Sequence, residues 1–372
     1  MIQVKKVTNQ ALLKKFVTFP FQLYKGSKYW VPPLIAEEMR IFDEKTNPVF
    51  KNAEAQLFLA FKNDEIVGRI AAIINWIEVK EQEKPKVRFG WFDTIDDLEV
   101  STALFQKVAE VGKNAELTFI EGPVGFSNMD KAGMLVDGFE RVNNMTTIYN
   151  YAYYPEHMKA LGFTTGLSWV EYEISVPTGV PEKIKKFSNL VLKRYHLKLL
   201  GFRSSKELIH YADGMFDLMN RSFKDLDSFV PIQPYQVELY KKKYLKFIHP
   251  DFITLIADKN DNLVAFSITM PSFANAMQKA KGKLFPFGFL HLLRAKNRND
   301  KANLFLIGVD PNYQSKGLTA VIFQKTIENF IKRNIKTVET NPELEDNTAV
   351  QALWKNYNPQ LIKKWQTFKR EL

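Results

Sequence analysis

Cysteine is absent from the 372 residues of the chain. This absence excludes disulfides, cysteine-ligated zinc, iron–sulfur clusters and a thiol nucleophile. The five histidines lie far apart and show no HExxH or HxH spacing, so we expect no metal site. No stretch approaches the roughly 18 uninterrupted apolar residues that a membrane-spanning helix needs. We therefore expect a cytoplasmic protein without a membrane span.

Acidic residues are outnumbered: 52 Lys and Arg against 41 Asp and Glu give a formal net charge of +11. Such an excess attracts nucleic acid, acidic lipids and phosphorylated cofactors alike, and charge alone does not choose among them. The segment Lys279–Lys301, here the basic insert, holds seven basic residues against one acid, Asp300. Two interpretations stay open: an amphipathic element that packs its aromatic side on the domain, or a lid or surface for an acyl chain, a lipid or an anionic cofactor.

Alternating apolar residues and turn residues predict the elements of the first half. In order, these are a strand at Ile2–Val7, a hairpin of Ala55–Phe61 and Glu65–Asn75, a strand at Val87–Asp93, a helix capped by Asp96 or Asp97, and a strand at Leu117–Gly125. The helical spacing of Leu98, Ala103 or Leu104, Val108 and Val111 places these side chains on one face of that helix.

The segment Pro177–Glu182 holds two prolines and a glycine and predicts a domain boundary. After it the same order of elements returns: a hairpin of Phe252–Asp258 and Asn262–Met270, a strand at Ala302–Val309, a helix at Leu318–Asn334, a strand at Thr337–Asn341 and a short helix at Thr348–Tyr357. Strands joined by helices predict an α/β class with mixed sheets. We expect two domains in tandem, residues 1–178 and 179–372, with the basic insert in the second.

One segment of the second domain suggests chemistry. A strand ends at Val309, and the sequence QSKGLT (Gln314, Ser315, Lys316, Gly317, Leu318 and Thr319) leads directly into an amphipathic helix. The first-turn amides of a helix have no intrahelical partner and, with the helix dipole, bind phosphate oxygens. Gly317 has no Cβ and permits close approach, Thr319 adds a hydroxyl donor and Lys316 adds a charge.

This segment resembles the acyl-CoA site of the GNAT acetyltransferase superfamily, whose Q/R-x-x-G-x-G/A sequence binds the coenzyme A pyrophosphate. Gln314, Gly317 and Thr319 occupy its three specified places, with Thr in place of Gly or Ala. The resemblance implies two GNAT-like domains, a pair of splayed strands that receives the pantetheine arm, and a backbone amide near Val309 that stabilises the acyl oxygen.

The same resemblance implies further site residues. Glu339 is expected to be the base, with Glu345 and Asp346 as alternatives, and Asn341 and Asn347 are expected to bind the pantetheine amides. Trp354 stands where the family often has the tyrosine that acts as general acid. Two expectations stay open: Tyr357, one turn later, is the acid, or the role is absent.

The first domain resembles the same fold with a degraded cofactor loop. Where the glycine-containing loop belongs, the chain reads DTIDDLEVS (Asp93–Ser101), which lacks glycine and would repel a pyrophosphate. Its segments Gly122–Phe139 and Tyr149–Phe163 resemble a bacterial group of tandem GNAT-like proteins. We therefore expect the cofactor in the second domain only.

The resemblance implies an N-acyltransferase that moves an acetyl or longer acyl group from coenzyme A to a small-molecule or peptide amine. Two alternatives stay open. One is an aminoacyl-tRNA-dependent transferase of the peptidoglycan-bridge type, which the net charge of +11 would suit. The other is a non-catalytic acyl-CoA-binding protein.

Overall fold

The protein is described by a computed structural model that covers residues 1–226, 229–241, 248–348, 350–351 and 357–372. The chain folds into two compact units. Unit 1 comprises Met1–Val170, Phe273–Leu293 and Ile362–Leu372, and unit 2 comprises Glu171–Ser272 and Arg294–Leu361. The sequence led us to expect one boundary, between residues 178 and 179. The two units instead each combine separate segments of the chain. Much of the basic insert and the C-terminal segment pack in unit 1, because their apolar partners lie there.

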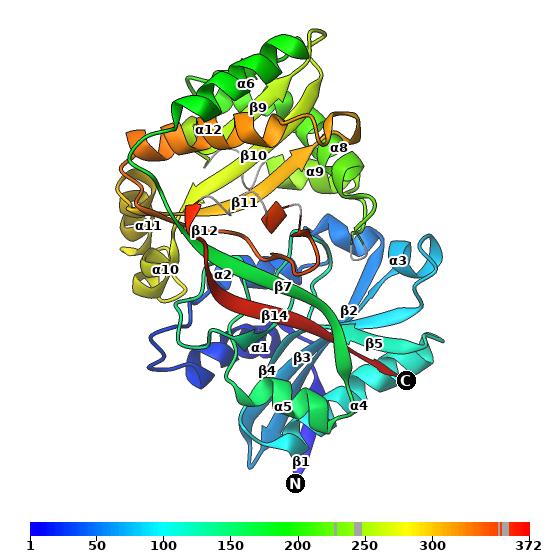
Figure 1. Cartoon of the computed structure of the whole chain (residues 1–372). Coiled ribbons are helices and arrows are strands. Elements are labelled where there is room, and N and C mark those ends of the chain that lie inside the picture. Colours follow the sequence, from blue (N-terminus) through cyan, green and yellow to red (C-terminus); the bar gives the residue numbers. More distant parts are fainter. Residues whose placement is uncertain (227–228, 242–247, 349, 352–356) are drawn as a thin grey trace. The chain divides into compact units, whose positions relative to one another are not determined.

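Unit 1 is built on a mixed sheet in the order β1-β2-β3-β4-β5-β14-β7 (Figure 1). Its strands are β1 (Ile2–Lys6), β2 (Ala53–Lys62), β3 (Glu65–Asn75), β4 (Lys86–Thr94), β5 (Phe119–Gly122), β14 (Gln360–Glu371) and the first part of β7 (Thr164–Ser175), with the short β6 (Met134–Asp137) paired to β14. Strands β1 to β4 are antiparallel neighbours, and β4 and β5 are parallel. The C-terminal strand β14 was not expected from the sequence.

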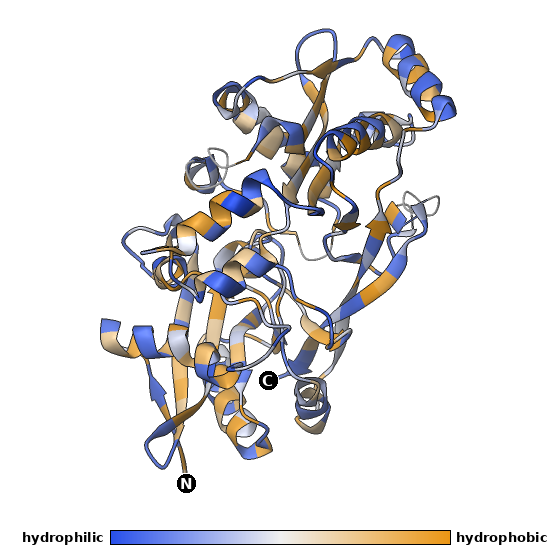
Figure 2. Ribbon diagram, turned by 90° about the vertical axis from the view of Figure 1, so that its left-hand side faces the viewer, coloured by the Kyte–Doolittle hydropathy of each residue, from blue (hydrophilic) through white to orange (hydrophobic). Residues whose placement is uncertain are grey.

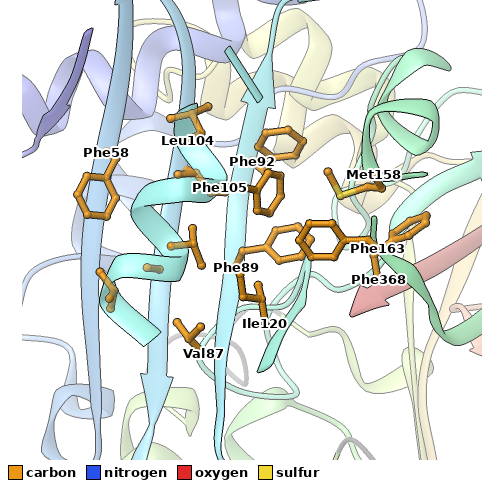
Figure 3. Close-up of a cluster of buried hydrophobic side chains, with 14 of the residues drawn as sticks. Phe58, Val87, Phe89, Phe92, Leu104, Phe105, Ile120, Met158, Phe163 and Phe368 are labelled. Atoms are coloured by element: carbon orange, nitrogen blue, oxygen red, sulfur yellow. The ribbon is translucent and has the colours of Figure 1, made fainter. Parts of the chain in front are cut away.

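Unit 1 contains several helices. They are α1 (Gln10–Leu23), α2 (Ile35–Ile41), α3 (Trp76–Lys80), α4 (Leu98–Asn114), α5 (Tyr153–Ala160), α10 (Ala274–Ala280) and the first part of α11 (Gly288–Asn297), with a 3-10 turn η1 at Pro48–Lys51. Helices α4 and α5 enclose one core with the sheet, and α1 encloses the other. Figure 3 shows the first core, where the rings of Phe89, Phe92, Phe105 and Phe163 meet between β4, α4 and the start of β7.

Local sequence explains the best-predicted elements of unit 1. Asn63 and Asp64 both have positive φ, which matches the tight turn expected between β2 and β3. Asp97 caps α4 by accepting a hydrogen bond from the Glu99 amide, as expected. Leu98, expected on the buried face of α4, is instead exposed, because it precedes the turn that meets the sheet.

Unit 2 contains a second mixed sheet in the order β7-β12-β11-β10-β9-β8. Its strands are the end of β7, β8 (Lys198–Leu200), β9 (Ile253–Ala257), β10 (Leu263–Pro271), β11 (Lys301–Val309) and β12 (Thr337–Glu339), with the two-residue β13 (Glu343–Leu344) paired to β7. Strands β8 to β11 are antiparallel neighbours, and β11 and β12 are parallel.

The helices of unit 2 are α6 (Glu182–Arg194), α7 (Ser205–Leu208), α8 (Ala212–Phe223), α9 (Pro234–Tyr240), the end of α11 and α12 (Leu318–Lys332), with 3-10 turns η2 (Ile209–Tyr211), η4 (Pro250–Phe252) and η5 (Pro311–Tyr313). Helices α6 and α12 lie side by side and pack on β9 and β10 (Figure 1). Helices in Figure 2 carry both orange and blue segments, the pattern of helices that bury one face.

The order of elements repeats between the units, as the sequence predicts. In each unit an antiparallel hairpin is followed by a third antiparallel strand, a long helix and a parallel strand: β2-β3-β4-α4-β5 and β9-β10-β11-α12-β12. The α/β class with mixed sheets is thereby confirmed. Within the described residues, no helix has the length and apolarity that crossing a membrane would take.

Candidate functional site

The parallel strands β11 and β12 of unit 2 pair over a short stretch and then separate. Lys301–Asn303 faces Thr337–Glu339, where β12 ends. Strand β11 continues to Val309, and its other edge stays paired with β10 along that length. In the described part of the chain, Leu304–Val309 therefore has one backbone edge without a neighbouring strand. Such an edge can bind an extended ligand through its amides and carbonyls.

A bulge lies in the part of β11 that is paired with β10 but not with β12. Thr269 of β10 faces Leu304, and Ile268 faces Leu306, so Phe305 is the extra residue. A bulge breaks the regular alternation of backbone groups and re-aims the amides beside it. The splay matches the strand geometry that the GNAT resemblance implies, whereas the bulge was not expected from the sequence.

The turn that follows β11 is held by the side chains of Asp310, Arg221 and Ser222. Asp310 is buried, accepts a hydrogen bond from the Asn312 amide at 2.9 Å and is ion-paired with Arg221 of α8. The Ser222 hydroxyl donates to the Val309 carbonyl at 3.1 Å. These contacts fix the end of β11 and direct the chain into the loop.

The loop before α12 presents free backbone donors. Ser315 and Gly317 both adopt left-handed backbone conformations, with φ of 59° and 82°. In the described part of the chain, the N–H groups of Ser315, Gly317, Leu318 and Thr319 donate to no acceptor. Left-handed turns and helix N-termini both collect amides into anion-binding concavities. The local geometry therefore fits a phosphate group.

Gly317 is required at this position for two reasons. Its φ is one that residues with a Cβ rarely adopt, and a Cβ built there would lie 2.9 Å from the Phe187 ring and 3.1 Å from Val191, both on α6. Side chains along the loop remain accessible, since Gln314, Ser315 and Lys316 are exposed and Thr319 is half-buried. The structure thus places QSKGLT at the entrance to α12, with Gln314, Ser315 and Lys316 exposed and Leu318 buried.

Lys316 keeps its charge at the rim of this turn. Its ammonium lies 5.0 Å from the ring centroid of Tyr313 and 5.4 Å from that of Tyr195. Both distances permit a cation–π interaction, which would hold the positive charge near the free amides.

Glu339 ends β12 where the two strands separate. It is half-buried, and one carboxylate oxygen accepts a hydrogen bond from Asn303 Nδ2 at 3.1 Å. Asn303 is its register partner on β11, so both side chains lie on the same face of the sheet. The position beside the free edge of β11 is the one that a base would need.

Tyr357 lies on the other side of the splay. It packs against the cluster of Ile174 and Phe323, and it lines a small apolar cavity of about 30 Å³ beside α12. Burial raises the pKa of Tyr357, so its hydroxyl stays protonated at neutral pH. Trp354, which stands at the usual tyrosine place, lies outside the described residues.

The two asparagines expected at the pantetheine are half-buried and follow β12. The Asn347 side chain accepts a hydrogen bond from the Val350 amide at 3.3 Å, so its oxygen is used in a local turn. Its amide nitrogen remains a possible donor to a ligand. Asn341 has interactions of its own within the chain. The alternative bases Glu345 and Asp346 differ from Glu339 in burial, because both are exposed on the loop that follows β13.

The equivalent region of unit 1 is filled by the chain itself. Beyond the paired residues of β4, the Phe89 carbonyl accepts a hydrogen bond from the Val124 amide at 2.9 Å. A Cβ on Gly90 would lie 2.7 Å from the Val124 carbonyl oxygen, so the two segments are in close contact. The segment after β5 thus occupies the edge that stays free in unit 2.

The acidic turn of unit 1 is also used internally. Asp93 is buried and ion-paired with Arg69 at 2.7 Å, and it accepts a hydrogen bond from the Tyr24 hydroxyl at 2.8 Å. Burial raises the pKa of Tyr24 and keeps that hydroxyl protonated. Asp97 caps α4 and pairs with Lys62. These contacts give the acidic residues structural roles in place of a phosphate site.

No protein-family model matches the chain, and the described residues contain no cluster of His, Asp and Glu suited to a metal. Comparison with solved structures defines the class. A tandem GNAT protein from the clavulanic acid biosynthesis pathway aligns over 100% of this chain and 98% of its own, with a TM-score of 0.56 and 11% identity. A GCN5-related N-acetyltransferase from Sphaerobacter thermophilus aligns over 100% and 95%, with a TM-score of 0.51 and 10% identity. The chain therefore has the tandem GNAT-like fold.

Two curated proteins are similar in sequence along most of the chain. Protein YghO of Escherichia coli K12 is 27% identical over 376 residues, covering 99% of this chain and 95% of that protein. A bacterial ceramide synthase of Caulobacter vibrioides is 26% identical over 323 residues, covering 84% of this chain and 82% of that protein. Both relatives are bacterial, and the resemblance to tandem GNAT-like proteins stated from the sequence is confirmed.

Proposed function

We propose that the chain is an N-acyltransferase that takes its acyl group from coenzyme A, with the site in unit 2. The observation that carries the proposal is the set of unpartnered amides at Ser315, Gly317, Leu318 and Thr319, within the described residues, at the end of a strand with a free edge. The donors suit a pyrophosphate and the free edge suits a pantetheine arm. An acyl-CoA would supply an activated thioester carbonyl.

In this proposal the site residues divide into those that bind the cofactor and those that transfer protons. The loop amides and Lys316 neutralise the phosphates, and the bulged backbone near Phe305 donates to the acyl oxygen as it gains negative charge. Glu339 accepts the proton of the attacking amine, while Asn303 orients its carboxylate. Tyr357, protonated and beside the splay, donates a proton to the leaving sulfur.

The acceptor proposed is a long-chain amine. The support is the name of one relative, bacterial ceramide synthase, since a ceramide is an amide of a long-chain amine. The acyl group would accordingly be a long-chain one. This choice of substrates is separate from the choice of cofactor, and each is measured on its own.

The binding test titrates the purified chain with acetyl-CoA and palmitoyl-CoA in a calorimeter. We expect about one equivalent to bind, and we expect Gly317→Glu to weaken binding roughly tenfold to a hundredfold, because its carboxylate opposes the phosphates. Gly317→Ala is the matched control, since it carries the same backbone strain and the same Cβ without the charge. Equal binding by the two variants would contradict this location.

Turnover provides the test of Glu339. Glu339→Gln should lower kcat by about 10² to 10⁴ with an unchanged Kd for acyl-CoA, because the amide oxygen still accepts from Asn303 while the base is lost. Asp346→Asn, on the exposed loop, should leave kcat unchanged. A loss in Asp346→Asn instead would assign the base to that loop. Salt-sensitive binding of tRNA without any binding of acyl-CoA would favour the aminoacyl-tRNA alternative.

A further inference from the structure

The segment Phe273–Leu293 carries both exposed apolar residues and basic residues, a composition typical of a binding surface. Helix α10 and the turn after it are attached to the N-terminal part of unit 1. Gln278 Nε2 donates to the carbonyls of Lys28 and Trp30, and the Ile35 amide donates to the Gly282 carbonyl. Ala274 and Met277 are buried against Val31 and Leu34. The base of the segment is thus well fixed.

Beyond this base, four apolar residues of the segment are exposed, while Leu292 still packs against the cluster at the base. The fractional exposures are 75% for Phe285, 68% for Phe287, 49% for Leu290 and 51% for Leu293. Leu290 and Leu293 are three positions apart on α11 and lie on one face. The interpretation that the aromatic side packs on the domain is therefore wrong for Phe285 and Phe287. We name Phe285, Phe287, Leu290 and Leu293 the insert tip.

Positive charges flank the insert tip on both sides in the sequence. Lys279, Lys281 and Lys283 precede it, and Arg294, Lys296 and Arg298 follow it. Within the part of the chain that the structure describes, none of these six cations forms an ion pair. They are thus available to an anionic partner.

We propose that the insert tip and its flanking cations bind a membrane surface rich in anionic lipids. The exposed rings and leucines enter the boundary between headgroups and acyl chains, while the Lys and Arg side chains reach the lipid phosphates. This chemistry needs apolar and basic groups on one exposed segment, which the segment provides. The proposal does not depend on the proposed acyltransferase activity.

An anionic bilayer suits this surface better than a nucleic acid does. Both ligands attract cations, and exposed rings can stack on bases. The leucines of α11, however, offer nothing to a stacked base, whereas they add apolar area to membrane insertion. A bilayer would thus bind both the rings and the leucines of the insert tip, whereas a nucleic acid would bind the rings alone.

The test measures partition of the full chain onto vesicles of phosphatidylcholine with and without phosphatidylglycerol. We expect binding to the anionic vesicles that weakens with salt. Phe285→Ser with Phe287→Ser should weaken it about tenfold or more, and replacing Lys279, Lys283 and Arg294 by Gln should weaken it about a hundredfold. Leu361→Ser, at 54% exposure, and a triple Gln variant at Lys14, Lys113 and Lys159 are the matched controls.

The absence of cysteine allows a direct readout of insertion. Phe287→Cys, labelled with an environment-sensitive fluorophore, should report an apolar environment on anionic vesicles, and labelled Leu361→Cys should not. The proposal would be overturned if the wild-type chain did not bind anionic vesicles, or if the tip variants bound them as well as the control variants do. Loss of tRNA binding in the same variants with vesicle binding intact would also overturn it.

Acyl-CoA binding measured without vesicles separates this proposal from the proposed function. The insert tip lies outside the loop before α12, so its variants should bind acyl-CoA as the wild type does. Failure of vesicle binding with normal acyl-CoA binding would reject the membrane surface alone.

Discussion

Charged residues of this chain occupy positions of very different depth. In unit 1, Glu78 is 1% exposed and forms ion pairs of 2.7 Å with Lys86 and Arg88, whose side chains are also buried. Lys62 and Asp97 form a pair of similar length at the surface. Breaking a buried pair leaves a charge without solvent or partner, so the two pairs should contribute differently to stability.

The first prediction concerns Glu78→Gln, measured by urea unfolding as a function of pH. At neutral pH the variant should lose about 3 kcal/mol, because the buried Arg88 loses its carboxylate partner, while Lys86 retains its ion pair with Glu121. Burial alone would raise the pKa of Glu78, but Arg88 and Lys86 outweigh it and hold the pKa below its ordinary value of 4.5. The stabilisation is therefore present above pH 4.5 and lost as the pH falls through the lowered pKa.

Asp97→Asn is the matched control for this prediction. Asn caps a helix about as well as Asp, so the variant isolates the surface pair with Lys62. We expect a loss of about 0 to 1 kcal/mol. A Glu78→Gln variant that unfolds like Asp97→Asn at neutral pH would mean that the buried Arg88 finds another partner.

At the scale of elements, helix α10 ends in a turn that depends on glycine. Gly282 has a φ of 78°, and a Cβ built there would lie 2.5 Å from the Phe21 ring and 3.1 Å from Ile35. Gly26 has a similar φ of 86°, with no atom within 4 Å of such a Cβ. The two glycines therefore share the backbone requirement and differ in packing.

The second prediction compares Gly282→Ala with Gly26→Ala by urea unfolding. Gly26→Ala should cost about 1 kcal/mol, from the left-handed backbone alone. Gly282→Ala should cost about 1 to 3 kcal/mol more, because the ring of Phe21 must move. Equal losses would show that Phe21 yields freely and that the turn is held by its backbone hydrogen bond.

At the scale of the whole molecule, the C-terminal strand belongs to the N-terminal unit. Strand β14 lies between β5 and β7 in the sheet of unit 1, and Trp365 is fully buried there with its indole N–H donating to the Ile148 carbonyl. Phe368 joins the core shown in Figure 3. The last residues of the chain thus contribute a strand and core side chains to unit 1.

The third prediction concerns this strand. Trp365→Ala should destabilise the protein by about 3 to 5 kcal/mol, because it leaves a cavity and removes the hydrogen bond to the Ile148 carbonyl. Leu361→Ala, at an exposed position near the start of the same strand, should change stability by less than about 0.5 kcal/mol. Unfolding monitored by near-ultraviolet circular dichroism checks both. A small effect of Trp365→Ala would indicate that unit 1 folds without β14.

Local patterns predicted much of both units. The β2–β3 turn, the Asp97 cap and the glycine before α12 each follow from residue chemistry that acts within a few positions of the chain. Other features had no local signal. Strand β14 carries Lys363 at a buried position, which hides its alternation, and Asn303 acquires its role only through the strand register with Glu339.

The sequence by itself determined the repeated order of hairpin, strand, helix and strand and the turn at Gln314–Thr319, because periodicity, capping and backbone conformation are local properties. The tertiary structure alone decided which unit receives β14 and the segment Phe273–Leu293, where β11 and β12 separate, and that Phe285 and Phe287 face outward. These features depend on partners distant in the sequence, since burial and strand pairing are set by the competition among all apolar surfaces of the chain.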